Sequence, residues 1–154
     1  MKDIYLKKLS ASCDSDVKSL LTVVNDPEVE KFVNYMYAKN EDFVKGFLED
    51  TTVLGIFDDS THELVGAMHV EDSDPHALYS SLEIAYCVGK DYRNKGYCKS
   101  AINALRTFYA GSKFVCFAFY VDITNVASLG VMHSISGVIE QRYDDRMHVF
   151  VIRL

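Results

Sequence analysis

The sequence predicts an α+β fold of three layers, in which helices flank a central, mostly antiparallel mixed sheet. Helical patterns dominate the first third of the chain, and a hairpin pattern follows them. The second half alternates strands with helices before two closing strands. With 154 residues, of which 49% are hydrophobic, the chain is expected to form one domain, 1–154, around a substantial core.

The N-terminal elements are a strand followed by three helices. Residues 2–9 alternate enough to form a strand. Pro27 suits the first turn of a helix with Asp26 as its N-cap, and Asn40 is placed to cap the next helix. The three helices are expected at 15–24, 27–37 and 41–50.

Strands and helices alternate along the rest of the chain. A hairpin is expected to turn across 58–61. Apolar residues crowd 82–88, which is typical of a buried strand, and an amphipathic helix follows. We expect strands at 51–57, 63–71, 80–88, 113–121, 138–143 and 147–153, helices at 97–110 and 125–135, and a loop at 72–76.

Composition and charge weigh against several classes of function. A net charge of −6 argues against a nucleic-acid binder and is compatible with a cationic partner such as an amine. The longest apolar run, within 114–121, is too short to cross a membrane, and the charged residues 1–8 do not form a signal peptide. The four cysteines show no Cys-x-x-Cys spacing, so free thiols in a cytoplasmic protein are favoured over disulfides or zinc ligation.

The segment 82–101 has the pattern of an anion-binding site. A strand leads into a turn that contains Gly96, and the turn opens a helix. The first N–H groups of a helix lack internal partners, and the macrodipole adds partial positive charge there. Arg93, Lys95 and Lys99 add full charges. A solvated basic turn is the plainer explanation of such a run, but the strand and helix around it favour binding of a pyrophosphate.

Several motifs resemble the GNAT superfamily of acetyl-CoA-dependent N-acetyltransferases. Residues 93–98 (Arg-x-x-Gly-x-Cys) resemble the family's Arg/Gln-x-x-Gly-x-Gly/Ala loop, with Cys98 where the family has a small residue. Residues 125–128 (Asn-Val-Ala-Ser) resemble the Asn-x-x-Ser that opens the family's next helix, and 137–140 resemble its Gly-Phe-x-x-Glu. Residues 25–29 (Asn-Asp-Pro-Glu-Val) resemble the branch that acetylates ribosomal-protein alanine N-termini, spermidine and similar amines.

The resemblance implies a GNAT fold whose sheet is splayed between the strands at 80–88 and 113–121. It implies direct transfer of acetyl from acetyl-CoA to a primary amine of a small molecule or a protein N-terminus. Residues 1–78 would then form the acceptor side, and 79–154 the acetyl-CoA-binding core with the C-terminal strands. The cofactor-binding residues carried over are the main chain of Tyr86, Cys87 and Val88, the loop residues Arg93, Asn94, Lys95, Gly96, Tyr97, Cys98 and Lys99, and also Asn125 and Ser128.

The resemblance also implies catalytic residues. Glu83 would be the base that removes a proton from an acceptor ammonium of pKa about 10, and a solvent-facing structural glutamate is the alternative. Tyr120 lies where some relatives carry a base and is expected to line the acceptor pocket. Many relatives protonate the leaving thiolate with a tyrosine. Here that position is Met132, so the sequence does not identify the acid, and a bound water or bulk solvent would suffice. Cys98, at a helix N-terminus, is expected to have a stabilised thiolate.

Other features leave alternatives open. His69 and His76, near the acidic run 71–74, lack a metal-ligand spacing, so no metal is expected and an acceptor-side loop is favoured. The sequence does not decide the acceptor amine, the acyl group or the oligomeric state, although homodimers are common in the family. Because of Met132 and Cys98, a catalytically degenerate CoA-binding sensor or scaffold is the alternative to an enzyme.

Overall fold

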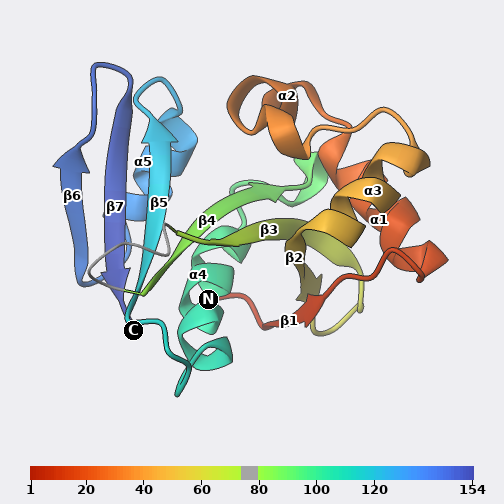
Figure 1. Cartoon of the computed structure of the whole chain (residues 1–154), viewed down its shortest axis with the longest axis horizontal. Helices are drawn as coiled ribbons and strands as arrows, with labels where there is room; N and C mark the ends of the chain where they lie inside the picture. Colours follow the sequence, from red (N-terminus) through yellow and green to blue (C-terminus); the bar gives the residue numbers. More distant parts are fainter. Residues whose placement is uncertain (74–79) are drawn as a thin grey trace.

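The described residues of the computed structural model, 1–73 and 80–154, form one seven-stranded sheet with helices around it (Figure 1). The strands are β1 (Ile4–Lys8), β2 (Thr52–Asp58), β3 (Leu64–Asp72), β4 (Ser81–Val88), β5 (Cys116–Asp122), β6 (Val138–Arg142) and β7 (Met147–Arg153). The α-helices are α1 (Asp14–Val24), α2 (Pro27–Phe32), α3 (Glu41–Asp50), α4 (Tyr97–Phe108) and α5 (Val126–His133), and the short 3-10 helices are η1 (Asn34–Met36) and η2 (Lys90–Tyr92).

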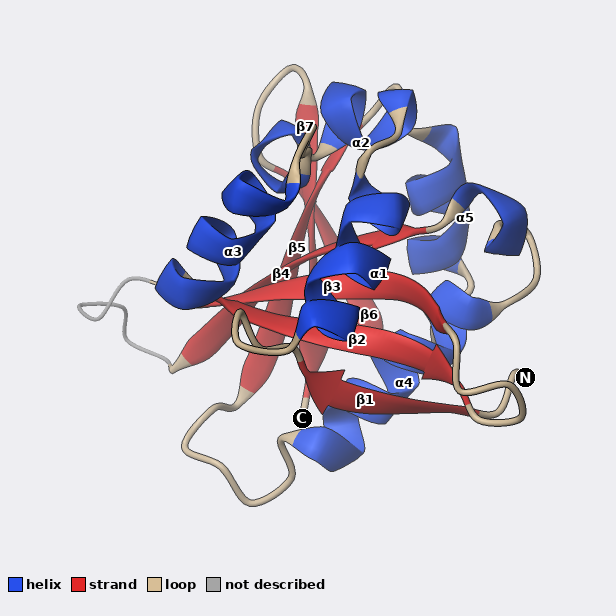
Figure 2. Ribbon diagram, turned by 90° about the vertical axis from the view of Figure 1, so that its right-hand side faces the viewer, coloured by secondary structure: helices blue, strands red, loops and turns tan. Residues whose placement is uncertain are grey.

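The sheet has one parallel junction. Its strand order is β1-β2-β3-β4-β5-β7-β6, and β4 pairs with β5 in parallel while the other neighbours are antiparallel. A parallel neighbour requires a crossover connection, and α4 provides it. Figure 2 shows α1 and α3 in front of the sheet and α4 behind it. The predicted mixed, mostly antiparallel sheet flanked by helices is confirmed.

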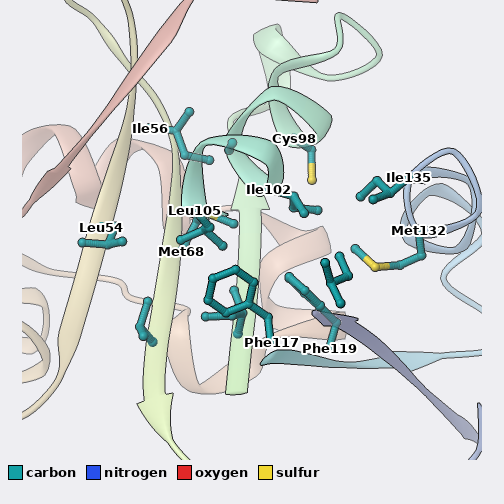
Figure 3. Packing of buried hydrophobic residues seen from close by; sticks show 14 of the residues in the cluster. Leu54, Ile56, Met68, Cys98, Ile102, Leu105, Phe117, Phe119, Met132 and Ile135 are labelled. Atoms are coloured by element: carbon teal, nitrogen blue, oxygen red, sulfur yellow. The ribbon is translucent and has the colours of Figure 1, made fainter. Parts of the chain in front are cut away.

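Two clusters of buried side chains, one on each face of the sheet, hold the layers together. The larger cluster joins α4 and α5 to the sheet through residues such as Ile102, Leu105, Phe117 and Met132 (Figure 3). The smaller cluster joins α1, α2 and α3 to the other face. Side chains alternate between the faces along each strand, so β5 buries Phe117 in the larger core and leaves Tyr120 outside it.

The elements differ most from prediction at two places. The helix predicted at 27–37 ends at Phe32, because Val33 has an extended φ of −139°, and the break lets Met36 enter the smaller core. The strand predicted at 113–121 begins at Cys116, since it is preceded by a bend at 112–113, where the Phe114 N–H donates to the Ser112 hydroxyl. The loop predicted at 72–76 lies mostly outside the described residues.

Candidate functional site

The two central strands diverge after a short paired stretch. β4 and β5 pair at three positions, from Ser81–Cys116 to Glu83–Ala118. Beyond Glu83, β4 stays paired with β3 as far as Val88, while β5 stays paired with β7 (Figure 1). The gap between the diverging strands, called the splay below, confirms the predicted feature of the fold. It leaves the rest of that edge of β4 without a strand partner in the described part of the chain.

The β3–β4 ladder shows which main-chain groups of β4 face the splay. The Gly89 N–H donates to the Val65 carbonyl at 2.8 Å, and bonded and non-bonded pairs alternate along an antiparallel ladder. By this alternation Cys87 directs its N–H and C=O toward β3, whereas Tyr86 and Val88 direct theirs toward β5. Of the three residues predicted to offer main-chain groups to a ligand, Tyr86 and Val88 therefore direct these groups into the splay, whereas Cys87 directs its groups toward β3.

The turn between β4 and α4 presents the N-terminus of α4. Asn94 and Gly96 adopt left-handed backbone conformations, with φ of 59° and 87°. Gly96 is the N-cap of α4, and its carbonyl accepts the Ser100 N–H at 3.1 Å. A Cβ built on Gly96 would meet no heavy atom within 4 Å. The space beside Gly96 is thus open, and the first N–H groups of a helix, which lack internal partners, can bind an anion there.

The three basic residues of the turn have different surroundings. The Arg93 Nε donates to the Val88 carbonyl at 3.0 Å, and its Nη2 lies 3.0 Å from the Asp26 Oδ1. The Lys95 Nζ donates at 2.6 Å to a main-chain carbonyl of the same turn, and both Lys95 and Lys99 are exposed. Neither lysine forms an ion pair with a carboxylate of the described residues, while the Arg93 side chain is held against the protein by Asp26.

The first side chains of α4 face inward. The Tyr97 hydroxyl donates to the Asp58 Oδ2 at 2.5 Å and anchors the start of the helix to the end of β2. Cys98 is 9% exposed, and its sulfur points toward the core (Figure 3). Burial raises the pKa of the Cys98 thiol to about 12. The prediction of a stabilised thiolate at this helix N-terminus is therefore wrong. Desolvation disfavours the charged form of Cys98 more than the helix dipole favours it.

A cavity of about 250 Å³ lies along the splay. Its walls come from the end of β4, the β4–α4 turn, α2 and the start of α5. The lining residues are Glu28, Val29, Phe32, Val33, Tyr86, Cys87, Val88, Tyr92, Arg93, Asn94, Gly96, Tyr97, Cys98, Asn125, Ala127, Ser128 and Val131. A smaller hollow of about 40 Å³ shares Tyr86, Asn125 and Ser128 with it and extends to Tyr120. The structure thus brings most of the predicted cofactor-binding residues around one cleft.

The start of α5 closes one side of the cleft. The Asn125 Oδ1 accepts the Ser128 N–H at 3.1 Å and caps the helix. The Ser128 hydroxyl lies 2.9 Å from the Tyr86 hydroxyl, so a hydrogen bond joins α5 to β4 across the cavity. Met132 is fully buried in the larger core and lines neither hollow (Figure 3). A side chain at this position therefore has no access to the cleft.

Glu83 and Tyr120 lie on the face of the sheet opposite to the larger core. Glu83 is exposed and lies directly across from Glu71 on β3. Partial burial, followed by the neighbouring Glu71 carboxylate, raises the pKa of Glu83. Because Glu83 pairs with Ala118, alternation places Tyr120 on the same face, where it is 40% exposed and its ring packs against Tyr143 at 5.1 Å. This face can receive a substrate.

His69 lies on this face too, two residues before Glu71 on β3. It is 7% exposed and packs between the rings of Tyr35 and Phe47, with centroid distances of 5.3 and 5.4 Å. Burial lowers the pKa of His69 and favours its neutral form. His76 lies outside the described residues, and within 1–73 and 80–154 no group of His, Cys, Asp and Glu is placed to hold a metal.

Sequence reasoning missed the part that α2 plays in the cleft. Asp26 was expected only as an N-cap; it does accept the Glu28 N–H at 2.8 Å, but it also pairs with Arg93. Phe32 and Val33 at the other end of α2 line both hollows. The motif at 25–29 was the only sequence feature that pointed to a role for α2. A local motif does not show which distant turn the helix will contact.

Comparisons with known proteins agree on the fold. Residues 5–136 match the model of the acetyltransferase (GNAT) domain family. No curated protein matches the sequence. Within the described part of the chain, no helix has the length and hydrophobicity needed to span a membrane.

Solved structures of low sequence identity superpose over nearly the whole chain. A GNAT-family acetyltransferase from Bacillus anthracis has 17% identity and a TM-score of 0.82, with 99% of this chain and 96% of that chain covered. Spermidine N-acetyltransferase from Vibrio cholerae, in complex with CoA and spermine, has 12% identity, a TM-score of 0.78 and coverages of 97% and 95%. Aminoglycoside acetyltransferase AAC(6′)-Ib, in complex with coenzyme A, has 12% identity, a TM-score of 0.75 and coverages of 98% and 95%.

Proposed function

This chain belongs to the GNAT acetyltransferase family, and we propose that it transfers acetyl from acetyl-CoA directly to a cationic primary amine. As a family member it is an acyltransferase with acetyl-CoA as its cosubstrate, which supplies an activated acetyl thioester. One observation carries the proposal: the unpaired edge of β4 and the open N-terminus of α4 border the same cavity.

The cleft offers two kinds of partner to CoA. The N–H and C=O of Tyr86 and the N–H of Val88 would pair with the extended pantetheine arm, as an added strand pairs with a sheet edge. The main-chain N–H groups that follow Asn94 and Gly96 would hold the pyrophosphate, with Lys95 and Lys99 adding positive charge nearby. Asn125 and Ser128, which line the same cavity, would border the arm from the side of α5.

We assign removal of the acceptor's proton to Glu83. An ammonium of pKa about 10 must lose a proton before it attacks, and a carboxylate is a better base at neutral pH when its pKa is raised. Glu83 meets this condition, since partial burial and Glu71 raise its pKa. Tyr120 lies beside it and would contact the acceptor. The Tyr86 N–H, which faces the splay, would donate to the acetyl oxygen as negative charge develops there.

The face that carries Glu71 and Glu83 favours a positively charged amine as the acceptor. Glu71 and Glu83 face each other on the open side of the sheet, and no Lys or Arg of the described residues forms an ion pair with either carboxylate. Like charges placed directly opposite one another are unfavourable until a cation joins them. The two CoA-bound structural neighbours are named for spermidine and aminoglycosides, both of which are polycationic amines.

Loss of catalysis with retained CoA binding is the alternative, and burial of Met132 is the observation that favours it. The chain then acts as a sensor or scaffold, because no side chain at that position can protonate the leaving thiolate. We favour the enzyme, since a water molecule in the cleft can supply this proton. Thiol release from acetyl-CoA, measured over a panel of spermidine, an aminoglycoside and a peptide with a free N-terminal alanine, separates the two.

Release above the no-acceptor rate for any amine supports the proposed function. CoA binding without release for every amine supports the sensor, and absence of CoA binding refutes both. Glu83→Gln serves as the matched control, since it should bind CoA and release little thiol.

We also propose a reducing, cytoplasmic setting. Cys13, Cys87, Cys98 and Cys116 all carry free thiols, as expected where disulfides do not persist. A homodimer stays a prediction, which sedimentation of the purified protein would test.

A further inference from the structure

One guanidinium joins three parts of the cleft. The Arg93 Nε donates to the Val88 carbonyl at the end of β4, and its Nη2 lies 3.0 Å from the Asp26 Oδ1 at the start of α2. The same Asp26 oxygen accepts the Glu28 N–H and caps α2. The side chain of Asp26 is 11% exposed and that of Arg93 is 31% exposed, so the pair is partly shielded from solvent. We call this contact the Arg93–Asp26 clamp.

The clamp neutralises the arginine. Burial disfavours the Asp26 charge, yet the pKa of Asp26 is lowered, because Arg93 and the Glu28 N–H donate to the carboxylate. Arginine stays charged in proteins, so both partners are ionised and their hydrogen bonds are charge-assisted. A guanidinium compensated in this way adds little net attraction for a pyrophosphate, whereas Lys95 and Lys99 lack such a partner among the described residues.

The helix held by the clamp has little stability of its own. α2 has six residues, and helices this short depend on tertiary contacts for their position. Val29 is buried in the smaller core, and Phe32 and Val33 line the cavity. Figure 1 shows α2 near the end of β4, where β4 and β5 diverge. Loss of the clamp would therefore loosen the wall that covers the pantetheine part of the cleft.

We propose that Arg93 is a positioning residue for the pantetheine arm and not a ligand of the pyrophosphate. Paired with Asp26, it holds α2 against the β4–α4 turn, so that the cavity has its full wall before CoA binds. This inference rests on the proposed function, because it takes the occupant of the cleft to be CoA. It assigns the pyrophosphate to the helix N-terminus and the two lysines.

The two roles of Arg93 predict opposite effects of Asp26→Asn. If Arg93 bound the pyrophosphate, loss of the neighbouring carboxylate would free the guanidinium and remove a repulsive charge, so CoA would bind more tightly. If the pair positions α2, the same change weakens CoA binding. Asparagine caps a helix about as well as aspartate, so the variant keeps the start of α2 intact.

The experiment measures dissociation constants by calorimetry for CoA and for 3′-phospho-ADP, which is CoA without its pantetheine arm. The variants are Asp26→Asn and Arg93→Lys, since lysine keeps the charge and lacks the fork that reaches both partners. Glu30→Gln is the matched control: it removes one exposed carboxylate from the same helix and leaves the clamp intact. We expect both clamp variants to bind CoA about tenfold more weakly, equivalent to about 1.4 kcal/mol, and 3′-phospho-ADP as wild type does.

Tighter CoA binding by Asp26→Asn, or equal losses of both ligands in Arg93→Lys, would overturn the inference. The double variant should lose no more than either single variant, and losses that multiply would count against the clamp. Thermal unfolding checks that each variant is folded. If Asp26→Asn does not fold, the two dissociation constants of Arg93→Lys are enough to test the inference. Wild-type protein that binds neither ligand refutes the proposed function, whereas clamp variants that behave like Glu30→Gln refute only this inference.

Discussion

Replacement of Gly96 by alanine tests the geometry of the anion site. Gly96 has φ of 87° and ψ of 0°, in the left-handed region. A residue with a Cβ in that region loses roughly 1–2 kcal/mol, and alanine recovers about 0.4–1 kcal/mol by restricting the unfolded chain. No atom lies within 4 Å of the added methyl group, so no clash adds to this difference. Gly96→Ala should therefore destabilise the protein by roughly 1 kcal/mol, or about 2–4 °C in Tm.

Gly46 provides a matched control of opposite sign. It lies inside α3, where a Cβ also meets no atom within 4 Å and φ is not positive. Glycine in a helix interior is less stable than alanine by about 0.5–1 kcal/mol. Gly46→Ala should raise Tm, whereas Gly96→Ala lowers it. Calorimetric unfolding of the three proteins without ligand gives both signs, and a stabilised Gly96→Ala would refute the backbone argument.

The same two variants report on the ligand. CoA at one hundred times its Kd should stabilise the wild type by about 2.7 kcal/mol, because only the folded chain binds it. The methyl group of Gly96→Ala enters the space in front of α4, so this gain should shrink, and Gly96→Asp should abolish it by adding bulk and negative charge. Gly46→Ala should keep the whole gain. A full CoA-induced shift in folded Gly96→Asp would show that the pyrophosphate binds elsewhere.

Three further predictions concern the base, the core and the pH dependence of stability. Glu83→Gln should lower turnover at neutral pH far more than it changes CoA affinity, and the loss should shrink as pH rises and free amine accumulates; a wild-type pH–rate profile would remove Glu83 from the mechanism. Met132→Tyr should overpack a fully buried site and destabilise the protein by about 1–3 kcal/mol in denaturant unfolding, without faster thiol release; a several-fold gain in turnover would contradict the proposed role of water. Hydrogen bonds from Ser60 and Tyr97 hold the pKa of Asp58 well below its ordinary 3.8, so its stabilisation is complete above that pH and is lost as pH falls toward the folded-state pKa. Tyr97→Phe should raise that pKa and flatten the acid limb of stability in urea titrations, and an unchanged limb would count against the contact.

The sequence alone determined the kinds of elements and their order. Hydrophobic periodicity is local, so it located α3 and β7 to the residue and identified the strand, turn and helix within 82–101. The sequence also identified Gly96 as a turn residue. Its left-handed backbone conformation depends on short-range sterics, which favour glycine there. The family resemblance rested on the same local motifs, and the predicted splay followed from it.

Only the tertiary structure decided what each side chain faces. Cys98 follows a helix N-terminus in sequence, yet packing against α5 and the sheet buries it and keeps its thiol neutral. Met132 faces the core. Arg93 pairs with Asp26, which caps a helix far away along the chain. Desolvation and ion pairing arise from contacts between elements remote in sequence, and no local pattern records which elements will meet.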